Sequence, residues 1–183
     1  MSTILLFVQQ DNGKLVKGSL VALSAAKELQ KAWNKSGIAA VCLGPGAGNA
    51  AKEAATFGFS QVLFSESALF AKYRAEPYAR AIALAAKDSS ADTLVAAATS
   101  TGKDVMPRVT AMLDGAQASD IVGVNADGSV KRPMYAGNMI ADVELTSNVK
   151  VVTVRGTAYP AATPAGAAGA VKELALAGDP ELV

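Results

Sequence analysis

Short apolar runs alternate with segments of helical period over the first two thirds of the chain. Residues 4–8 are continuously apolar, which is typical of a strand buried on both faces. Beyond them, Ala22, Ala26, Leu29 and Trp33 fall on one face of a helix, and we expect Trp33 to anchor the core. This alternation of strands and helices is the pattern of βαβ units. It predicts an α/β fold with a Rossmann-like, mainly parallel sheet and helices on both of its faces.

We place the ends of the predicted helices and strands from the length of each apolar run, the spacing of its apolar residues, and the capping residues, glycines and prolines that flank it. Ser19 offers an N-cap for the first helix, and Pro77 lies in the first turn of the third, where its missing N–H is harmless. The fourth helix is expected to be capped by Asp104, which places Pro107 in its first turn. The predicted helices span residues 19–37, 49–57, 75–87 and 104–115, and the predicted strands span 4–8, 39–43, 61–64, 93–98 and 121–124.

The spacing of apolar residues changes after residue 124, from segments of helical period to short strand-like runs. The turn over residues 125–129 contains the Asp-Gly pair that favours a hairpin, and strands are predicted at 129–134, 136–144 and 150–154. We expect these three strands to form a small antiparallel sheet, appended to the parallel one near the C-terminus.

The last segment is rich in alanine, glycine and proline and has no period. Residues 160–169 are therefore typical of a linker. Residues 170–176 fit either an edge strand or a continuation of that linker, and the pattern does not decide between the two. We expect one α/β domain over residues 1–159 and a linker-like tail over residues 160–183.

Composition excludes several classes of function. The formal net charge of +1, from 17 basic and 16 acidic side chains, gives no field that would attract nucleic acid or an anionic membrane. The sequence has no histidine, which removes the Ser-His-Asp hydrolases and the histidine-based zinc enzymes. Cys42 lies in an apolar run, where we interpret it as a buried structural residue. We expect no catalytic residue and no bound metal in this chain.

The N-terminal residues carry neither a basic segment nor a long apolar stretch. No signal peptide and no membrane insertion are therefore expected. A reducing cytoplasm fits this composition best.

One loop has the position of an anion site. Ser100, Thr101, Gly102 and Lys103 stand where a predicted strand ends and a helix begins, and the free N–H groups and dipole of a helix favour an anion there. The spacing of a P-loop is absent, and such loops are common in folds that bind nothing. We expect at most a weak anion site. The glycine loop at residues 44–48 lacks the third glycine of the dinucleotide fingerprint, so we interpret it as a plain loop.

Three arginines, Arg108, Arg132 and Arg155, are candidates for an interface, because a guanidinium group suits interface ion pairs. The alternative is a structural role. Arg108 would then pair with an acid such as Asp104 or Asp120, and Arg155 would cap the end of a strand. Both interpretations stay open.

Residues 135–138 are expected to form a bend between two of the appended strands, since Gly137 and Asn138 tolerate a positive φ. Arginine and tyrosine are the residue types that anchor interfaces, and these motifs have no catalytic partners in the chain. The predicted subunit interface comprises Arg132, Tyr135, Asn138 and Arg155.

Three motifs, in this order and spacing, carry a family resemblance. They are residues 102–109 (GKDVMPRV), 132–138 (RPMYAGN) and 152–159 (VTVRGTAY). Together they closely resemble the N-terminal domain of the electron transfer flavoprotein alpha subunit, over residues 4 to about 159. The chain departs from the family at Gln9-Gln10, where a Glu-His pair is common, and at Met139, where a smaller residue is usual.

The resemblance implies a scaffold domain that docks the beta subunit and supports a flavin domain. In the family, FAD is bound by a C-terminal domain of the alpha subunit and AMP by the beta subunit. Electrons pass from dehydrogenases, such as acyl-CoA dehydrogenases, through FAD to the respiratory chain. Because the sequence ends at Val183, we expect no flavin domain and no cofactor in it. The expected location is the bacterial cytoplasm, or the mitochondrial matrix in a eukaryote.

A rival interpretation is a nucleotide-binding module of the universal stress protein type. Such a module shares the layout of a parallel sheet with helices. It requires a phosphate-binding glycine stretch before its last strand, and the sequence has none. The resemblance to the flavoprotein therefore carries more weight.

Overall fold

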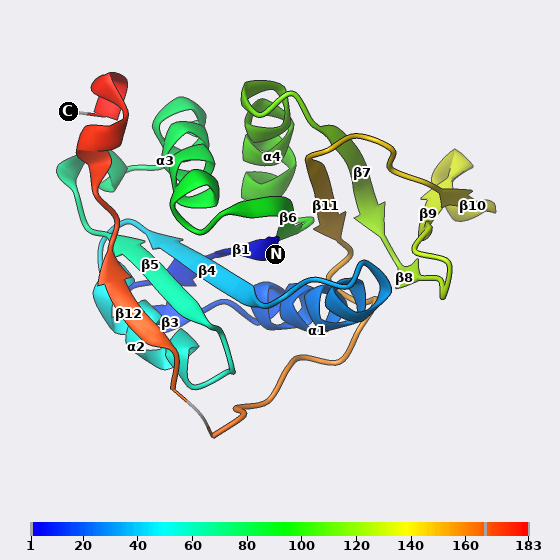
Figure 1. The fold of residues 1–183 in the computed structure, drawn as a ribbon, viewed down its shortest axis with the longest axis horizontal. Coiled ribbons are helices and arrows are strands. Elements are labelled where there is room, and N and C mark those ends of the chain that lie inside the picture. Colours follow the sequence, from blue (N-terminus) through cyan, green and yellow to red (C-terminus); the bar gives the residue numbers. More distant parts are fainter. Residues whose placement is uncertain (1, 167, 183) are drawn as a thin grey trace.

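The computed structural model describes residues 2–166 and 168–182. Its centre is a seven-stranded sheet in which every neighbouring pair of strands is parallel (Figure 1). The predicted α/β fold with a mainly parallel sheet is confirmed. In spatial order the strands are β12 (Ala170–Glu173), β5 (Gln61–Ser65), β4 (Ile38–Leu43), β1 (Thr3–Val8), β6 (Ala91–Ala97), β11 (Lys150–Val154) and β7 (Ala116–Ile121).

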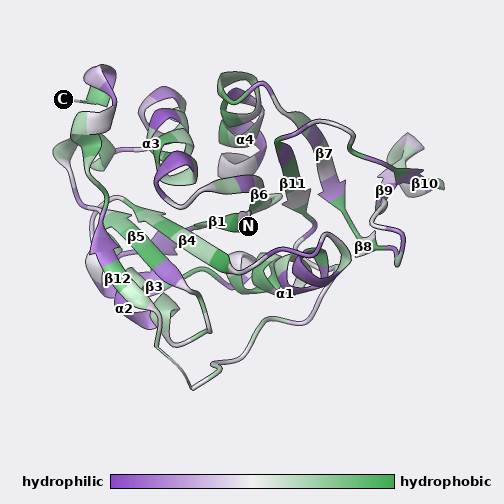
Figure 2. Cartoon of the chain, in the orientation of Figure 1, coloured by the Kyte–Doolittle hydropathy of each residue, from purple (hydrophilic) through white to green (hydrophobic). Residues whose placement is uncertain are grey.

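Helices cover both faces of this sheet, as predicted (Figure 1). Side chains of β1 alternate between the two layers: Ile4 and Leu6 belong to the apolar cluster on one face, and Leu5 and Phe7 to the cluster on the other. The strands at the centre are mostly hydrophobic (Figure 2), as expected for strands buried on both sides. One face carries α1 (Lys17–Ala32) and α2 (Ala47–Ala55), and the other carries α3 (Ala75–Asp88) and α4 (Ser100–Met112).

Two small antiparallel sheets accompany the main one. A two-stranded hairpin of β2 (Gln10–Asp11) and β3 (Lys14–Leu15) follows β1 directly. A three-stranded sheet has the order β10-β9-β8 and contains β8 (Gly123–Val124), β9 (Val130–Met134) and β10 (Met139–Val143). The hairpin of β9 and β10 projects from the side of the molecule next to β7 (Figure 1).

The structure corrects the predicted composition of the antiparallel part. Residues 150–154 do not belong to it, because β11 lies between β6 and β7 in the parallel sheet. The predicted fifth strand at 121–124 is also wrong: β7 ends at Ile121, and Gly123–Val124 forms β8. A period of two residues identifies a strand, but it does not specify which sheet the strand joins.

Two predicted helix N-caps are wrong as well. Ser19 lies inside the first turn of α1, where its hydroxyl oxygen accepts a hydrogen bond from the backbone N–H of Gln9 (2.8 Å). The N-cap of α4 is Thr99 instead of Asp104, so Pro107 is the eighth residue of the helix. Pro107 is exposed at that position. Its ring removes one helical hydrogen bond, which the helix tolerates at some cost in stability.

The segment after Tyr159 runs back across the molecule to the opposite edge of the sheet (Figure 1). There β12 pairs in parallel with β5, so residues 170–173 form an edge strand. Two short 3-10 turns, η3 (Leu176–Gly178) and η4 (Pro180–Leu182), follow beside α3. Leu174 and Leu182 are buried there, each with 3% of its surface exposed. Residues 170–182 are therefore packed against the sheet and α3.

Candidate functional site

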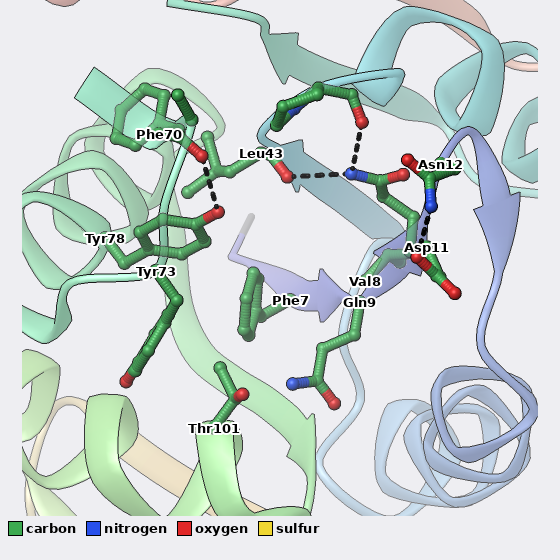
Figure 3. A pocket seen from close by; sticks show the side chains of 13 residues that line it. Phe7, Val8, Gln9, Asp11, Asn12, Leu43, Phe70, Tyr73, Tyr78 and Thr101 are labelled. Carbon is green, nitrogen blue, oxygen red and sulfur yellow. Dashed lines mark hydrogen bonds between the residues drawn. The ribbon is translucent and has the colours of Figure 1, made fainter. Parts of the chain in front are cut away.

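A crevice lies at the carboxyl end of β1, the strand at which the order of strands along the chain switches from one side of the sheet to the other. Strands β4 and β5 extend the sheet on one side of β1, and β6 extends it on the other. In open α/β sheets, ligands bind at the carboxyl ends of the strands at this switch point. Here a cavity of about 290 Å³ is lined by the carboxyl end of β1 and by α4 and the loop before α3 (Figure 3).

Four aromatic rings form the wall of this cavity. The ring of Tyr78 makes edge-to-face contacts with Phe7, Phe70 and Tyr73, at centroid distances of 6.3, 5.3 and 5.1 Å. Such pairs contribute about 0.5–1.5 kcal/mol each beyond the area they bury. The Tyr78 hydroxyl donates to the carbonyl of Phe70 (3.3 Å). The wall is therefore held mainly by contacts within the protein.

Two of the polar side chains around the cavity, Gln10 and Tyr73, are also bonded to the protein. The side-chain amide nitrogen of Gln10 donates to the carbonyls of Leu43 and Pro45, and its oxygen accepts from the backbone N–H of Gly13 (2.7 Å). The Tyr73 hydroxyl donates to Asp104 (2.7 Å), and burial together with this bond raises the pKa of Tyr73 above its usual value. The amide nitrogen of Gln9 and the hydroxyl of Thr101, by contrast, make no hydrogen bond with the described residues (Figure 3).

Charge further disfavours a phosphate in this cavity. Asp11 is the only charged residue among those lining it in the described part of the chain. A phosphate group would meet a carboxylate and no lysine or arginine, which is the reverse of the usual recognition.

The N-terminus of α4, where an anion site was predicted, is capped by the protein itself. The Thr99 hydroxyl oxygen accepts from the backbone N–H of Gly102 (3.0 Å) and donates to the amide oxygen of Gln9 (2.8 Å). The N–H of Lys103 donates to the carbonyl of Thr99 (2.8 Å). Only the first N–H groups of the helix, those of Ser100 and Thr101, lack such partners among the described residues.

Gly102 is required in this turn for packing. A Cβ built at Gly102 would lie 2.0 Å from the carbonyl oxygen of Ala97, the last residue of β6. The glycine therefore brings the helix close to the end of the strand. This contact explains the glycine without a ligand.

The hairpin of β9 and β10 contains three of the four predicted interface residues. Arg132 lies on β9, and Tyr135 and Asn138 lie in the turn, all three exposed. Tyr135 has 73% of its surface exposed. Positive φ occurs at Tyr135 (49°), Ala136 (56°) and Gly137 (94°), whereas Asn138 has a φ of −71°. The predicted bend at residues 135–138 and the positive φ of Gly137 are therefore confirmed, whereas the positive φ at Asn138 is wrong.

Exposed apolar side chains surround these residues. Met134 (42%), Met139 (59%) and Ile140 (53%) are among the few large apolar side chains that are exposed in the described structure. The register places Met134 opposite Met139 on one face of the hairpin, and the same face ends at Val130 and Val143, which pack in the core. From the sequence, Met139 was named only as a departure from the family and this apolar surface was not predicted, although a predicted strand with apolar residues on both faces and no covering helix was the available signal.

Arg155 is separate from this hairpin. At the end of β11, its guanidinium group donates to the carboxylate of Asp120 through two nitrogens (2.6 and 3.2 Å). Asp120 lies at an irregularity of β7 with a φ of 59°. Arg108 pairs with Asp104, at 3.7 Å. Of the two interpretations that the sequence left open, these contacts favour the structural one for Arg108 and Arg155.

The described residues contain neither a cluster of metal ligands nor a reactive cysteine. No group of three or more potential ligands could hold a metal ion there. Burial raises the pKa of the Cys42 thiol to about 12, so the thiol stays protonated and unreactive, as its apolar sequence context predicted. In the part of the chain that the structure covers, we find no helix that has both the length and the apolar character to span a membrane.

Comparison with known proteins gives the family. The profile of the electron transfer flavoprotein domain matches residues 4–179. The chain belongs to the electron transfer flavoprotein family. Electron transfer flavoprotein alpha subunits from Pseudomonas aeruginosa and Paracoccus denitrificans are 36% and 37% identical over 172 and 171 residues, or 93% of this chain in each case. The mitochondrial alpha subunit of rice is 32% identical over 158 residues, 84% of this chain.

The chain spans about half the length of these relatives: 53%, 54% and 44%. It corresponds to the N-terminal domain of the electron transfer flavoprotein alpha subunit.

The start of α2, which follows the glycine loop at residues 44–48, does not fit a flavin dinucleotide. A flavin dinucleotide requires glycines that let its diphosphate approach the backbone at the start of a helix. Gly46, the N-cap of α2, instead lies against the β2–β3 hairpin, because a Cβ there would lie 2.6 Å from the backbone nitrogen of Gly13. The β2–β3 hairpin therefore occupies the approach to the N-terminus of α2 at Gly46.

Proposed function

We propose that this chain is a scaffold domain that docks the beta subunit of an electron transfer flavoprotein. The observation that supports it best is the projecting β9–β10 hairpin, with four exposed large apolar residues next to an arginine. Exposed apolar groups of this kind mark sites of protein association. The crevice and the α4 N-terminus are less suitable, because Asp11 is the only charged residue that lines the crevice among the described residues and the cap of α4 already engages the N–H groups of Gly102 and Lys103.

In this proposal, the cofactors are bound by other parts of the assembled protein. FAD is carried by the C-terminal domain of the full-length alpha subunit, and AMP by the beta subunit. The assembled protein accepts electrons from dehydrogenases, such as acyl-CoA dehydrogenases, and passes them to the respiratory chain. FAD supplies the redox chemistry, and this domain supplies a docking surface without catalytic residues of its own. We place it in the cytoplasm of a bacterium, or in the mitochondrial matrix of a eukaryote.

Within the docking surface, Tyr135 and Arg132 are proposed as the anchoring residues, and Asn138 as a contact at the turn. Large aromatic and arginine side chains carry most of the binding energy in many interfaces. Arg132 forms no ion pair with the described residues, so its guanidinium group is free for an acidic partner. Arg155 is expected to act indirectly, by holding Asp120 at the end of β7.

The test is to measure binding of the beta subunit to the wild-type chain and to variants. Tyr135→Ala and Arg132→Ala are each expected to cost about 2 kcal/mol, or about thirtyfold in affinity. Tyr73→Ala and Arg108→Ala are matched controls, because both residues are exposed but lie away from the hairpin. Equal binding by all four variants would remove the hairpin from the interface.

A further inference from the structure

The crevice at the carboxyl end of β1 holds two polar groups that the rest of the described chain leaves unpaired. The amide nitrogen of Gln9 and the hydroxyl of Thr101 belong to residues that line its cavity of about 290 Å³, and neither group makes a hydrogen bond with the described residues. Figure 3 shows both groups directed toward the same space beside the ring of Phe7. A few polar groups that converge in one cavity are typical of a small-molecule site.

Contacts within the protein fix the orientation of the Gln9 amide. The Thr99 hydroxyl accepts from the backbone N–H of Gly102 (3.0 Å) and donates its own proton to the amide oxygen of Gln9 (2.8 Å). The oxygen of this amide therefore faces Thr99, and the nitrogen keeps both of its N–H groups for another partner. Thr101, in the first turn of α4, adds a hydroxyl. Together the two side chains offer N–H and O–H donors to one oxygen atom of a ligand.

An exposed aromatic ring lines the same cavity. Tyr73 has 42% of its surface exposed, yet its hydroxyl donates to Asp104 (2.7 Å) and its ring makes an edge-to-face contact with Tyr78 (5.1 Å). These contacts tie the loop before α3 to α4 and α3, so the ring is held in place without a ligand. A flat ring that stacks on Tyr73 would therefore cost little side-chain ordering.

The charge of the cavity disfavours anions. Asp11 is the only charged residue that lines it among the described residues. A carboxylate or a phosphate would meet that negative charge, with no lysine or arginine in the lining to offset it. A neutral carbonyl oxygen accepts the same hydrogen bonds from Gln9 and Thr101 without bringing a net charge. The volume lies at the lower end of the range for ligand sites, which suits a single ring system.

We propose that this crevice binds a small, flat, uncharged ring compound that carries a carboxamide or lactam group. The carbonyl oxygen of the ligand accepts from the Gln9 amide and the Thr101 hydroxyl, and its ring lies against Tyr73. Asp11 disfavours the corresponding carboxylic acids. AMP and ATP fall outside this class, because adenine has no carbonyl group and their phosphates are anionic. The site shares no residue with the β9–β10 hairpin and does not depend on the proposed docking function.

Benzamide and benzoate are matched probes, because they share a ring and differ in carrying a neutral amide or an anionic carboxylate. Titration of the isotope-labelled full chain, followed by NMR, gives Kd from the shifts of the Gln9 side-chain amide and the Thr101 backbone amide. We expect benzamide to bind with a Kd of about 1 mM, as befits a ligand of this size. Benzoate should bind at least about tenfold more weakly, because Asp11 repels it.

Gln9→Glu tests the amide donor. Its carboxylate keeps an oxygen for the Thr99 hydroxyl, so the cap of α4 is retained, but it offers no N–H to a ligand. We expect Gln9→Glu to bind benzamide at least about tenfold more weakly than wild type, and the benzamidinium cation about tenfold more tightly. Thr101→Val removes the second donor and should weaken benzamide binding about threefold to tenfold. Ser100→Ala is the matched control, since Ser100 precedes Thr101 but does not line the cavity.

Melting temperatures show whether each variant is folded. Thr101→Val alters no hydrogen bond of the described residues, so it decides the question of the donors if Gln9→Glu is unstable. Equal benzamide binding by wild type and the folded donor variants would overturn the roles of Gln9 and Thr101. Benzoate that binds as tightly as benzamide would overturn the choice of a neutral ligand. The absence of saturable benzamide binding up to about 10 mM would overturn the site itself, whereas the docking function is tested separately by binding of the beta subunit.

Discussion

At the scale of single residues, Gly102 shows how closely α4 approaches the sheet. Replacing Gly102 with alanine would place a Cβ 2.0 Å from the carbonyl oxygen of Ala97. The helix would have to move away, so we expect a loss of about 2 kcal/mol or more in the free energy of unfolding. For a chain of this size, that corresponds to a drop of about 4–8 °C in melting temperature.

The matched control is Gly156→Ala, in the exposed loop after β11. No atom lies within 4 Å of a Cβ at Gly156, so its free energy of unfolding should stay within about 0.5 kcal/mol of wild type. Similar melting temperatures for the two variants would contradict the close approach at Gly102.

Single residues were predictable where local chemistry decides their role. The free, buried state of Cys42 followed from its apolar neighbours, and the structural alternative for Arg108 named the acid with which it pairs. The conformation of Asn138 was not predictable. Asparagine tolerates a positive φ, but here the strained positions fell on Tyr135 and Ala136, because the register of the hairpin fixes where the turn begins.

At the scale of elements, the N-terminus of α4 gives a prediction about nucleotides. Thr99 and the helix itself already engage the N–H groups of Gly102 and Lys103. We expect AMP or ATP at millimolar concentration to change the melting temperature by less than about 1 °C, because stabilisation requires a ligand concentration well above Kd. A shift of several degrees would establish a nucleotide site and favour a stress-protein type of function. Inorganic phosphate serves as the control for a general anion effect.

Most helices and strands could be located from the spacing of their apolar residues and from the residues that end them. The strands with which they pair could not be predicted in this way. β11 was assigned to the wrong sheet, although Val151, Val152 and Val154 are all fully buried and such a run is typical of a central parallel strand. β12 carried no signal of this kind, since all four of its residues are exposed. The exposed hairpin was located, but its apolar surface depends on what the fold leaves uncovered, which no local pattern reveals.

At the scale of the whole molecule, the C-terminal segment joins the edge of the sheet to α3. Leu174 is buried there with 3% of its surface exposed, whereas Val171 in β12 has 38% exposed. We expect Leu174→Ala to lower the free energy of unfolding by about 2–4 kcal/mol, as a cavity in a packed core does. Val171→Ala should cost less than about 1 kcal/mol. Urea unfolding of both variants is the measurement, and equal midpoints would mean that the segment behaves as a linker in solution.

The position of β11 has a consequence for how the chain acquires its shape. Strand β7 reaches the sheet only through β11, which is made some thirty residues later and stands between β7 and β6. During synthesis, residues 116–121 of β7 therefore have no place in the seven-stranded sheet until residues 150–154 have emerged. Such long-range pairing is slow, because the intervening loop must close first. The hairpin that follows β7 stays unanchored during that interval, so a nascent chain fixes the position of the hairpin only after β11 has been made.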